Sequence, residues 1–226
     1  MSAASPRVTV RRHPERGAYE RVAIENILDE ALFCHVGFVV DVQPFVIPTI
    51  HARVGDLLYL HGSPASRMLS TLGSGIDVCV TATLLDGVVL ARAVYNHSLN
   101  YRSAVVLGRA RVVDERGEKL AALEAIVEHV VAGRSRDARA PNDKELNGTK
   151  VLALPLDEAS AKVRSGPPKD FDADLDLSTW AGVIPLRTVA DEPVTEERVP
   201  RGVAIPGYAA NYRRPSPTRA SDVPPQ

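Results

Sequence analysis

The sequence predicts a mainly β protein, a small antiparallel β-barrel with a few inserted helices. At least six stretches are rich in β-branched and aromatic residues and follow one another at hairpin spacing. Residues 45–61 and 76–95 each hold two such stretches with only a turn between them. Parallel strands need a longer crossover, usually a helix, so this spacing argues against a parallel α/β sheet.

Composition narrows the class of protein. A chain of 226 residues can bury the core of one domain, and its formal charge of -1 argues against a general nucleic-acid or membrane-surface binder. Cys34 and Cys79 lie in apolar runs, as buried reduced thiols do. No N-terminal apolar segment or membrane-length apolar run is present, so we expect a soluble cytoplasmic protein without a membrane partner.

The first half of the chain predicts two helices and three strands. Apolar residues recur every three or four positions over 19–31, which indicates an amphipathic helix. Strands are expected at 32–42, 45–52 and 57–61, the last two joined by a turn at Gly55-Asp56. A second helix is expected over 64–72, with Ser63 as its N-cap and Gly73 as its stop.

The second half adds strands and one long helix. Asp86-Gly87 is typical of a hairpin turn between strands at 76–84 and 88–95. A long strand over 102–113, a helix over 118–131 and a strand over 149–156 follow; residues 158–164 fit either a short helix or an edge segment. The domain division is then an N-terminal arm, a β-barrel domain and a proline-rich, extended or disordered tail, at residues 1–16, 17–190 and 191–226.

Residues 61–69, HGSPASRML, form a candidate anion site where a strand turns into a helix. The first turn of a helix offers unpaired N–H groups, and Ser63 and Ser66 add hydroxyls while Arg67 adds a forked cation. Phosphate is the anion that we expect such a site to bind. An ordinary capped helix with a solvated arginine fits these nine residues as well.

Two further stretches carry polar groups at strand boundaries. In Asn100-Tyr101-Arg102-Ser103 the arginine is a candidate second cation and the tyrosine a flat surface for a ring, although a solvated strand start fits equally. Pro48 interrupts the strand at 45–49, because proline cannot donate to a ladder. An edge or a break in pairing there exposes backbone groups that can pair with the edge of a planar heterocycle.

The histidines do not predict a zinc site. His35, His51, His61 and His97 lie on separate segments without the spacing of a metal cluster, and no metal site is predicted from them. The alternative that one of these histidines ligates a haem iron stays open.

Taken together, these motifs resemble the pyridoxamine 5'-phosphate oxidase-like, flavin-nucleotide-binding family, and the nearest branch looks like the nitroimidazole-resistance (Nim-like) proteins. The resemblance runs from about Arg11 to about Leu186 and rests on HPERG, PFVIPT, HGSPASRML, NYRSAVVLGRA, SAKVRSGPP and TWAGVIPL. It implies an FMN-binding split β-barrel, usually a homodimer with two flavin sites at the subunit interface.

The resemblance also implies residue roles. By analogy, Ser66 and Arg67 hold the FMN phosphate, and His61, Gly62 and Ser63 lie next to the ribityl chain. The isoalloxazine would be lined by Val46, Ile47, Pro48 and Thr49 and reached by Asn100, Tyr101, Arg102 and Ser103, with Trp180 completing the pocket from the other subunit. Tyr101 and His97 are the candidates for a general acid, and neither is assigned.

Departures from the family pattern narrow the expected activity. Met68 stands where the vitamin B6 oxidases carry lysine, and their substrate-phosphate arginine and histidine have no counterpart near the C-terminus. We therefore expect an FMN-dependent oxidoreductase that takes hydride from a nicotinamide donor and reduces a nitro compound or a similar small acceptor. The alternative is a flavin- or haem-binding storage or sensing protein, and a deazaflavin in place of FMN stays open.

Overall fold

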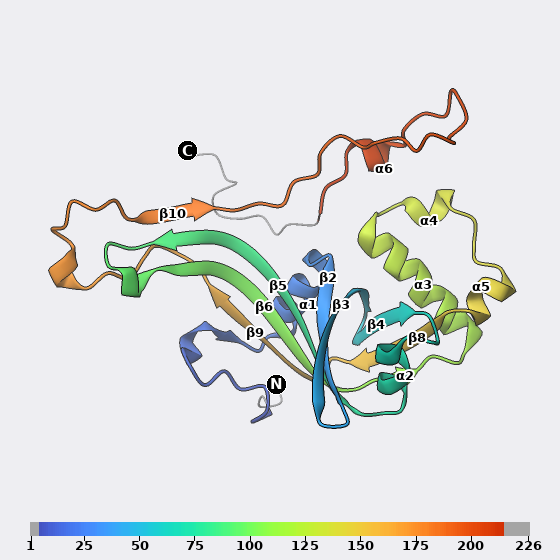
Figure 1. Ribbon diagram of the computed structural model, residues 1–226, viewed down its shortest axis with the longest axis horizontal. Coiled ribbons are helices and arrows are strands. Elements are labelled where there is room, and N and C mark those ends of the chain that lie inside the picture. The colour runs from blue at the N-terminus through green and yellow to red at the C-terminus, as the bar shows by residue number, and fades with distance from the viewer. Residues whose placement is uncertain (1–4, 215–226) are drawn as a thin grey trace.

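The computed structural model describes residues 5–214; residues 1–4 of the predicted arm and 215–226 of the predicted tail lie outside the described residues. All strand pairs within the described part are antiparallel, in the order β1-β9-β6-β5-β2-β3-β4-β8-β7, with β10 added beside β5 (Figure 1). The prediction of a mainly antiparallel β protein with inserted helices is confirmed.

The elements have the following bounds. The strands are β1 Gly17–Ala18, β2 Phe33–Val40, β3 Gln43–Val54, β4 Leu57–Gly62, β5 Asp77–Leu90, β6 Ser98–Arg109, β7 Arg111–Val112, β8 Lys150–Pro155, β9 Glu158–Arg164 and β10 Gly182–Pro185. The helices are α1 Arg21–Glu30, α2 Arg67–Gly73, α3 Arg116–Val130, α4 Arg134–Asp137, α5 Asp143–Asn147 and α6 Gly207–Ala210, with short 3-10 turns η1 Pro14–Arg16, η2 Val94–Asn96 and η3 Asp172–Asp174. In the described residues, no helix has the length and hydropathy needed to cross a membrane.

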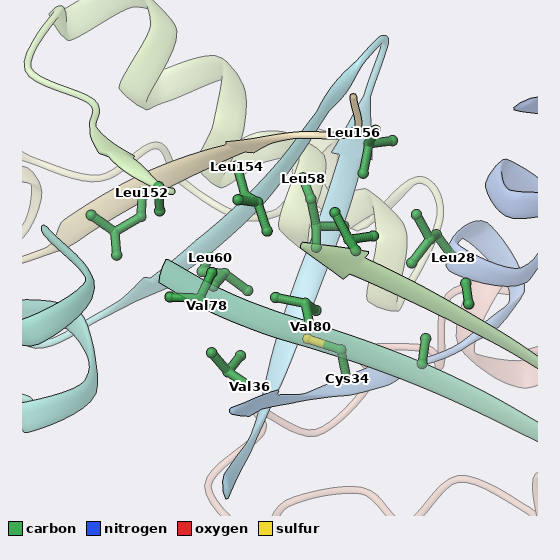
Figure 2. Close-up of a cluster of buried hydrophobic side chains, with 14 of the residues drawn as sticks. Leu28, Cys34, Val36, Leu58, Leu60, Val78, Val80, Leu152, Leu154 and Leu156 are labelled. Carbon is green, nitrogen blue, oxygen red and sulfur yellow. The ribbon is translucent and has the colours of Figure 1, made fainter. Parts of the chain in front are cut away.

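The main core lies where β4 and β8 cross β2 and β5. Leu58 and Leu60 of β4 pack with Leu152 and Leu154 of β8, and all four are fully buried (Figure 2). Leu28 of α1 joins them because the apolar stripe of that helix faces the sheet. A smaller cluster on the other face of β8 packs under α3. This core fixes the strand ends that carry the candidate site.

The hairpin expected at Asp86-Gly87 is wrong. β5 continues through these residues to Leu90, and the chain turns at η2 instead. Asp86 is the extra residue of a β-bulge, because Leu85 pairs with Tyr101 while Gly87 already pairs with Asn100. Gly87 is small because β10 lies close: a Cβ there would sit 3.0 Å from the carbonyl oxygen of Ile184.

Residues 158–164, which the sequence left between helix and strand, form β9, a strand between β1 and β6. The long strand expected over 102–113 is divided into β6 and β7.

The described part of the tail packs against the helices. After β10 it runs back over the molecule to α6 (Figure 1). The Arg214 guanidinium donates to the carbonyl oxygens of Asp29, Glu30 and His129, which belong to the last turns of α1 and α3. The Tyr212 hydroxyl donates to the carbonyl of Val130 at 2.9 Å. Carbonyls at helix C-termini lack partners within the helix, so these side chains cap both helices.

Candidate functional site

The segment between β4 and α2 begins its helix three residues later than predicted. Ser63 is not the N-cap: its carbonyl accepts from the N–H of Ser66 at 2.9 Å, and its hydroxyl accepts from the N–H of Ala65 at 3.2 Å. This local turn competes with the helix, as serine side chains often do. Ser66 is the N-cap, with no side-chain cap hydrogen bond, and α2 has only seven residues. Anion binding here therefore depends on side chains more than on a helix dipole.

Arg67, the first residue of α2, supplies a positive charge next to β3. Its guanidinium carbon lies 4.5 Å from the centroid of the Phe45 ring on β3, a cation–π contact that orients the side chain. Within residues 5–214 no carboxylate forms an ion pair with Arg67. The ring holds the guanidinium in place without neutralising it, so the charge is available to an anion.

His61, near the end of β4, has an unsatisfied nitrogen. Its Nδ1 is buried and has no hydrogen-bond partner. Burial lowers the pKa of His61, which favours the uncharged imidazole. A buried ring nitrogen without a partner is uncommon in a folded protein, and a bound ligand is one way of satisfying it.

Residues 46–49 lie on a free stretch of β3. Residues 43–50 pair with β2, whereas the ladder to β4 covers only His51 to Val54. The other edge of β3 at Pro48 thus carries no strand partner in the described part of the chain, as the proline predicts. Ile47 and Thr49 are partly buried on the side of Phe45, while Val46 is 68% exposed on the opposite face. This edge, Phe45 and Arg67 form the β3–α2 corner.

The polar residues at the start of β6 are engaged within the chain. Arg102 donates to Glu30 Oε1 at 2.8 Å and to Asp86 Oδ2 at 2.9 Å, and these carboxylates raise its pKa. Asn100 donates to the carbonyl of Gly166 at 3.1 Å. Arg102 accordingly offers no free cation to a phosphate in this chain.

The structure brings only part of the predicted site together. Residues 61–67 and the β3 edge meet at the β3–α2 corner, whereas residues 100–103 lie on β6, three strands across from β3. Three strand spacings amount to about 14 Å. Trp180, 64% exposed, precedes β10, which pairs with the end of β5 remote from α2 (Figure 1). That remote end lies on the order of 40 Å along the strand from Asp77.

Sequence reasoning assigned no role to Phe45 in holding the arginine. The ring lies 22 positions before Arg67, and only the fold brings them together. The available signal was the aromatic residue in PFVIPT.

An arginine without a carboxylate partner, beside an unpaired strand edge, is a suitable site for a phosphate group. A family model described as pyridoxamine 5'-phosphate oxidase matches residues 20–163. The chain belongs to the pyridoxamine 5'-phosphate oxidase family, and the resemblance seen in the sequence is confirmed. A search of curated proteins found no match.

Solved structures agree with this assignment. The flavocytochrome Anf3 from Azotobacter vinelandii is 37% identical, with a TM-score of 0.88 over 93% of this chain and 98% of that chain. The FAD and heme binding protein from Mycobacterium smegmatis is 36% identical, with a TM-score of 0.82 over 85% of this chain and 95% of that one. A candidate 5-nitroimidazole antibiotic resistance protein from Bacteroides thetaiotaomicron is 28% identical, with a TM-score of 0.55 over 65% and 86% of the two chains.

Proposed function

We propose that this protein is a flavin-dependent oxidoreductase that takes electrons from a nicotinamide donor and passes them to a small oxidised organic acceptor such as a nitro compound. The observation that carries the proposal is the Arg67 guanidinium, oriented by Phe45 and unpaired with any carboxylate in the described residues. Family membership and the FAD-binding relative support a flavin as the group it holds.

The residues of the β3–α2 corner suit a flavin nucleotide. Arg67 and the uncommitted Ser66 hydroxyl bind the phosphate, and the orphaned Nδ1 of His61 gains a partner near the ribityl chain. The free edge of β3 at 46–49 offers backbone groups to the edge of the ring system. The bound flavin supplies the electron chemistry, while the chain binds and orients it. FMN and FAD share the phosphate that these residues recognise.

A homodimer completes the site in this proposal. Large apolar side chains stay exposed on the outer face of β2 and β3 and at the far end of the β5–β6 ribbon: Phe33 51%, Val39 53%, Val46 68%, Val94 90%, Tyr95 83% and Trp180 64%. Apolar area of this kind is typical of subunit interfaces. A second copy would bring Trp180 and residues 100–103 to the corner that one chain leaves open. Sedimentation equilibrium tests the dimer.

An absorption spectrum with mass identification of the bound ligand tests the flavin. We expect flavin bands, and we expect Arg67→Gln to weaken FMN binding at least tenfold, because a charge-assisted contact to phosphate is lost. Arg109→Gln is the matched control, since Arg109 is an exposed arginine on β6 paired with Asp77. Stopped-flow mixing with NADH or NADPH then separates turnover from storage. Purification without flavin, together with unchanged FMN affinity in Arg67→Gln, would refute the proposal.

Haem binding is the second candidate, and His97 favours it. The Nδ1 of His97 lies 3.0 Å from the carbonyl of Ala93, which places the proton on that nitrogen and leaves Nε2 for a metal. Nearby, Tyr95 and Phe171 stack with ring centroids 6.3 Å apart and remain largely exposed, an apolar surface for a flat macrocycle. Two relatives, a flavocytochrome and an FAD and heme binding protein, support this candidate.

Reconstitution with hemin tests the second candidate. A Soret band lost in His97→Ala but kept in His35→Ala supports it. A Soret band unaffected by His97→Ala, or absent from the native protein, contradicts it.

A further inference from the structure

A cationic cavity lies away from the β3–α2 corner, between the segment before β1 and the end of β9. Its volume is about 190 Å³, well above the roughly 10 to 15 Å³ of such space that one water molecule needs. The charged lining residues are Arg16, Arg164 and Lys169 against the single carboxylate of Glu15. Three positive charges and one negative charge give the lining an excess of two positive charges.

Arg164 is the buried charged residue of the cavity lining. It ends β9, opposite Tyr101 of β6, and is only 7% exposed. Its guanidinium donates to the side-chain oxygen of Asn100 and to the carbonyl oxygen of Pro167 at 3.2 Å, all neutral groups. Arginine keeps its proton in proteins, so this buried charge cannot be removed by deprotonation.

Other guanidiniums at the interior of this fold are neutralised. Arg53 donates to Asp29 at 2.6 Å, and Arg92 donates to Asp170 at 2.8 Å. Arg102 has both Glu30 and Asp86. Arg164, the most buried of the four, has no carboxylate ion pair among the residues that the structure describes. A buried charge without a counter-charge is unfavourable unless something else supplies one.

Arg16 increases this imbalance. Burial lowers the pKa of Arg164, and the charge of Arg16 lowers it further, because two like charges face one cavity. The Glu15 carboxylate does not pair with Arg164. It lies 3.1 Å from His13 Nδ1 and 3.8 Å from Arg16 Nε instead. An anion in the cavity would screen the repulsion.

We propose that this cavity is a second anion-binding site, which takes the phosphoryl group of a phosphate ester or a diphosphate. The excess of two positive charges matches a phosphoryl dianion, and the planar fork of an arginine matches its oxygens. Within one chain the site is separate from Arg67. The Phe45 ring under Arg67 lies near the Gly108 level of β6 through the sheet register, whereas Arg164 faces Tyr101, about 20 to 25 Å back along the strand.

Calorimetric titration of the purified full chain with pyrophosphate and with AMP tests the site. We expect saturable binding, weakened about tenfold by Lys169→Gln and by Arg16→Gln, since each removes one charge-assisted contact. Arg11→Gln is the matched control, an exposed arginine of the same segment outside the lining. Tighter binding of AMP than of pyrophosphate identifies a nucleotide source, and the reverse order identifies a free diphosphate; either order supports a phosphoryl site.

Three outcomes would overturn the proposal. One is no heat of binding for either anion at millimolar concentration. Another is binding that Lys169→Gln and Arg16→Gln leave unchanged. The third is binding lost in Arg67→Gln, which would assign the anion to the β3–α2 corner; the same variant distinguishes failure of this site from failure of the flavin site.

Discussion

Arg102→Gln tests whether the Arg102 guanidinium stabilises the fold or binds the ligand. Arg102 joins Glu30 of α1 to Asp86 of the β5 bulge, with 2.8 Å from Nη2 to Glu30 Oε1 and 2.9 Å from Nε to Asp86 Oδ2. Glutamine keeps much of the stem but removes the charge. The Glu30 carboxylate then stays in a largely buried position without its ion pair.

The size of the effect follows from burial. The Arg102, Glu30 and Asp86 side chains are 15%, 11% and 17% exposed. Removing one partner of a buried ion pair costs about 3 to 5 kcal/mol, and partial solvent access reduces this to about 2 to 4 kcal/mol. In a chain of this size, that loss lowers the melting temperature by roughly 5 to 15 °C. Urea unfolding at neutral pH measures the free energy of unfolding directly.

Arg109→Gln on the same strand is the control. Its pair with Asp77 lies at the surface, with side chains 68% and 59% exposed, so its loss should leave the urea midpoint unchanged within error. If Arg102→Gln proves as stable as this control, the assignment to the fold is refuted. A selective loss of FMN affinity at unchanged stability would instead make Arg102 a flavin ligand, as the sequence resemblance implies.

Three further predictions test the core and its titrating groups. Leu58→Ala should cost about 2 to 5 kcal/mol in urea unfolding, because Leu58 is fully buried between strands. A thiol reagent at pH 8 should label Cys79 in the native protein and Cys34 only after unfolding, because burial raises the pKa of Cys34 to about 12. Burial lowers the pKa of His51 from 6.5 to about 4, so the unfolded chain takes up a proton first. Stability should therefore fall by about 3 kcal/mol between pH 6.5 and 4, and His51→Gln should flatten that slope.

Much of the fold is predictable because its patterns are local. The helix expected over 19–31 is α1 at Arg21–Glu30, and the turn at Gly55-Asp56 joins β3 to β4. The apolar periodicity of these segments indicates which face is buried, and burial of that face determines whether the segment is a helix or a strand. Periodicity needs no knowledge of distant residues.

One error occurs where a distant segment determines the role of a residue. Asp86-Gly87 has the composition of a hairpin turn, yet Gly87 is small because β10, almost a hundred positions later, lies against it. At Ser63 the error is local, because the serine bonds its own turn in preference to capping the helix. Composition alone does not separate these uses of glycine and serine.

The same reasoning applies to the candidate site. Ser66 and Arg67 are recognisable because polar residues directly follow an apolar strand. The stacking of Arg67 on Phe45 is not, since the two residues, 22 positions apart, meet only in the folded chain. The sequence thus indicates an anion site, but not what holds its cation in position.

Arg67, Arg102 and Arg164 show why residue type alone does not reveal function in this protein. The register of β5 and β6 places Arg102 opposite Leu84, and the bulge that follows brings in Asp86, so this arginine is neutralised by the fold. The other two meet an aromatic ring and neutral oxygens instead. A guanidinium with a carboxylate partner stabilises the chain, whereas one without such a partner has charge left for a ligand. The pairing that tertiary structure imposes therefore distinguishes a structural arginine from a binding one.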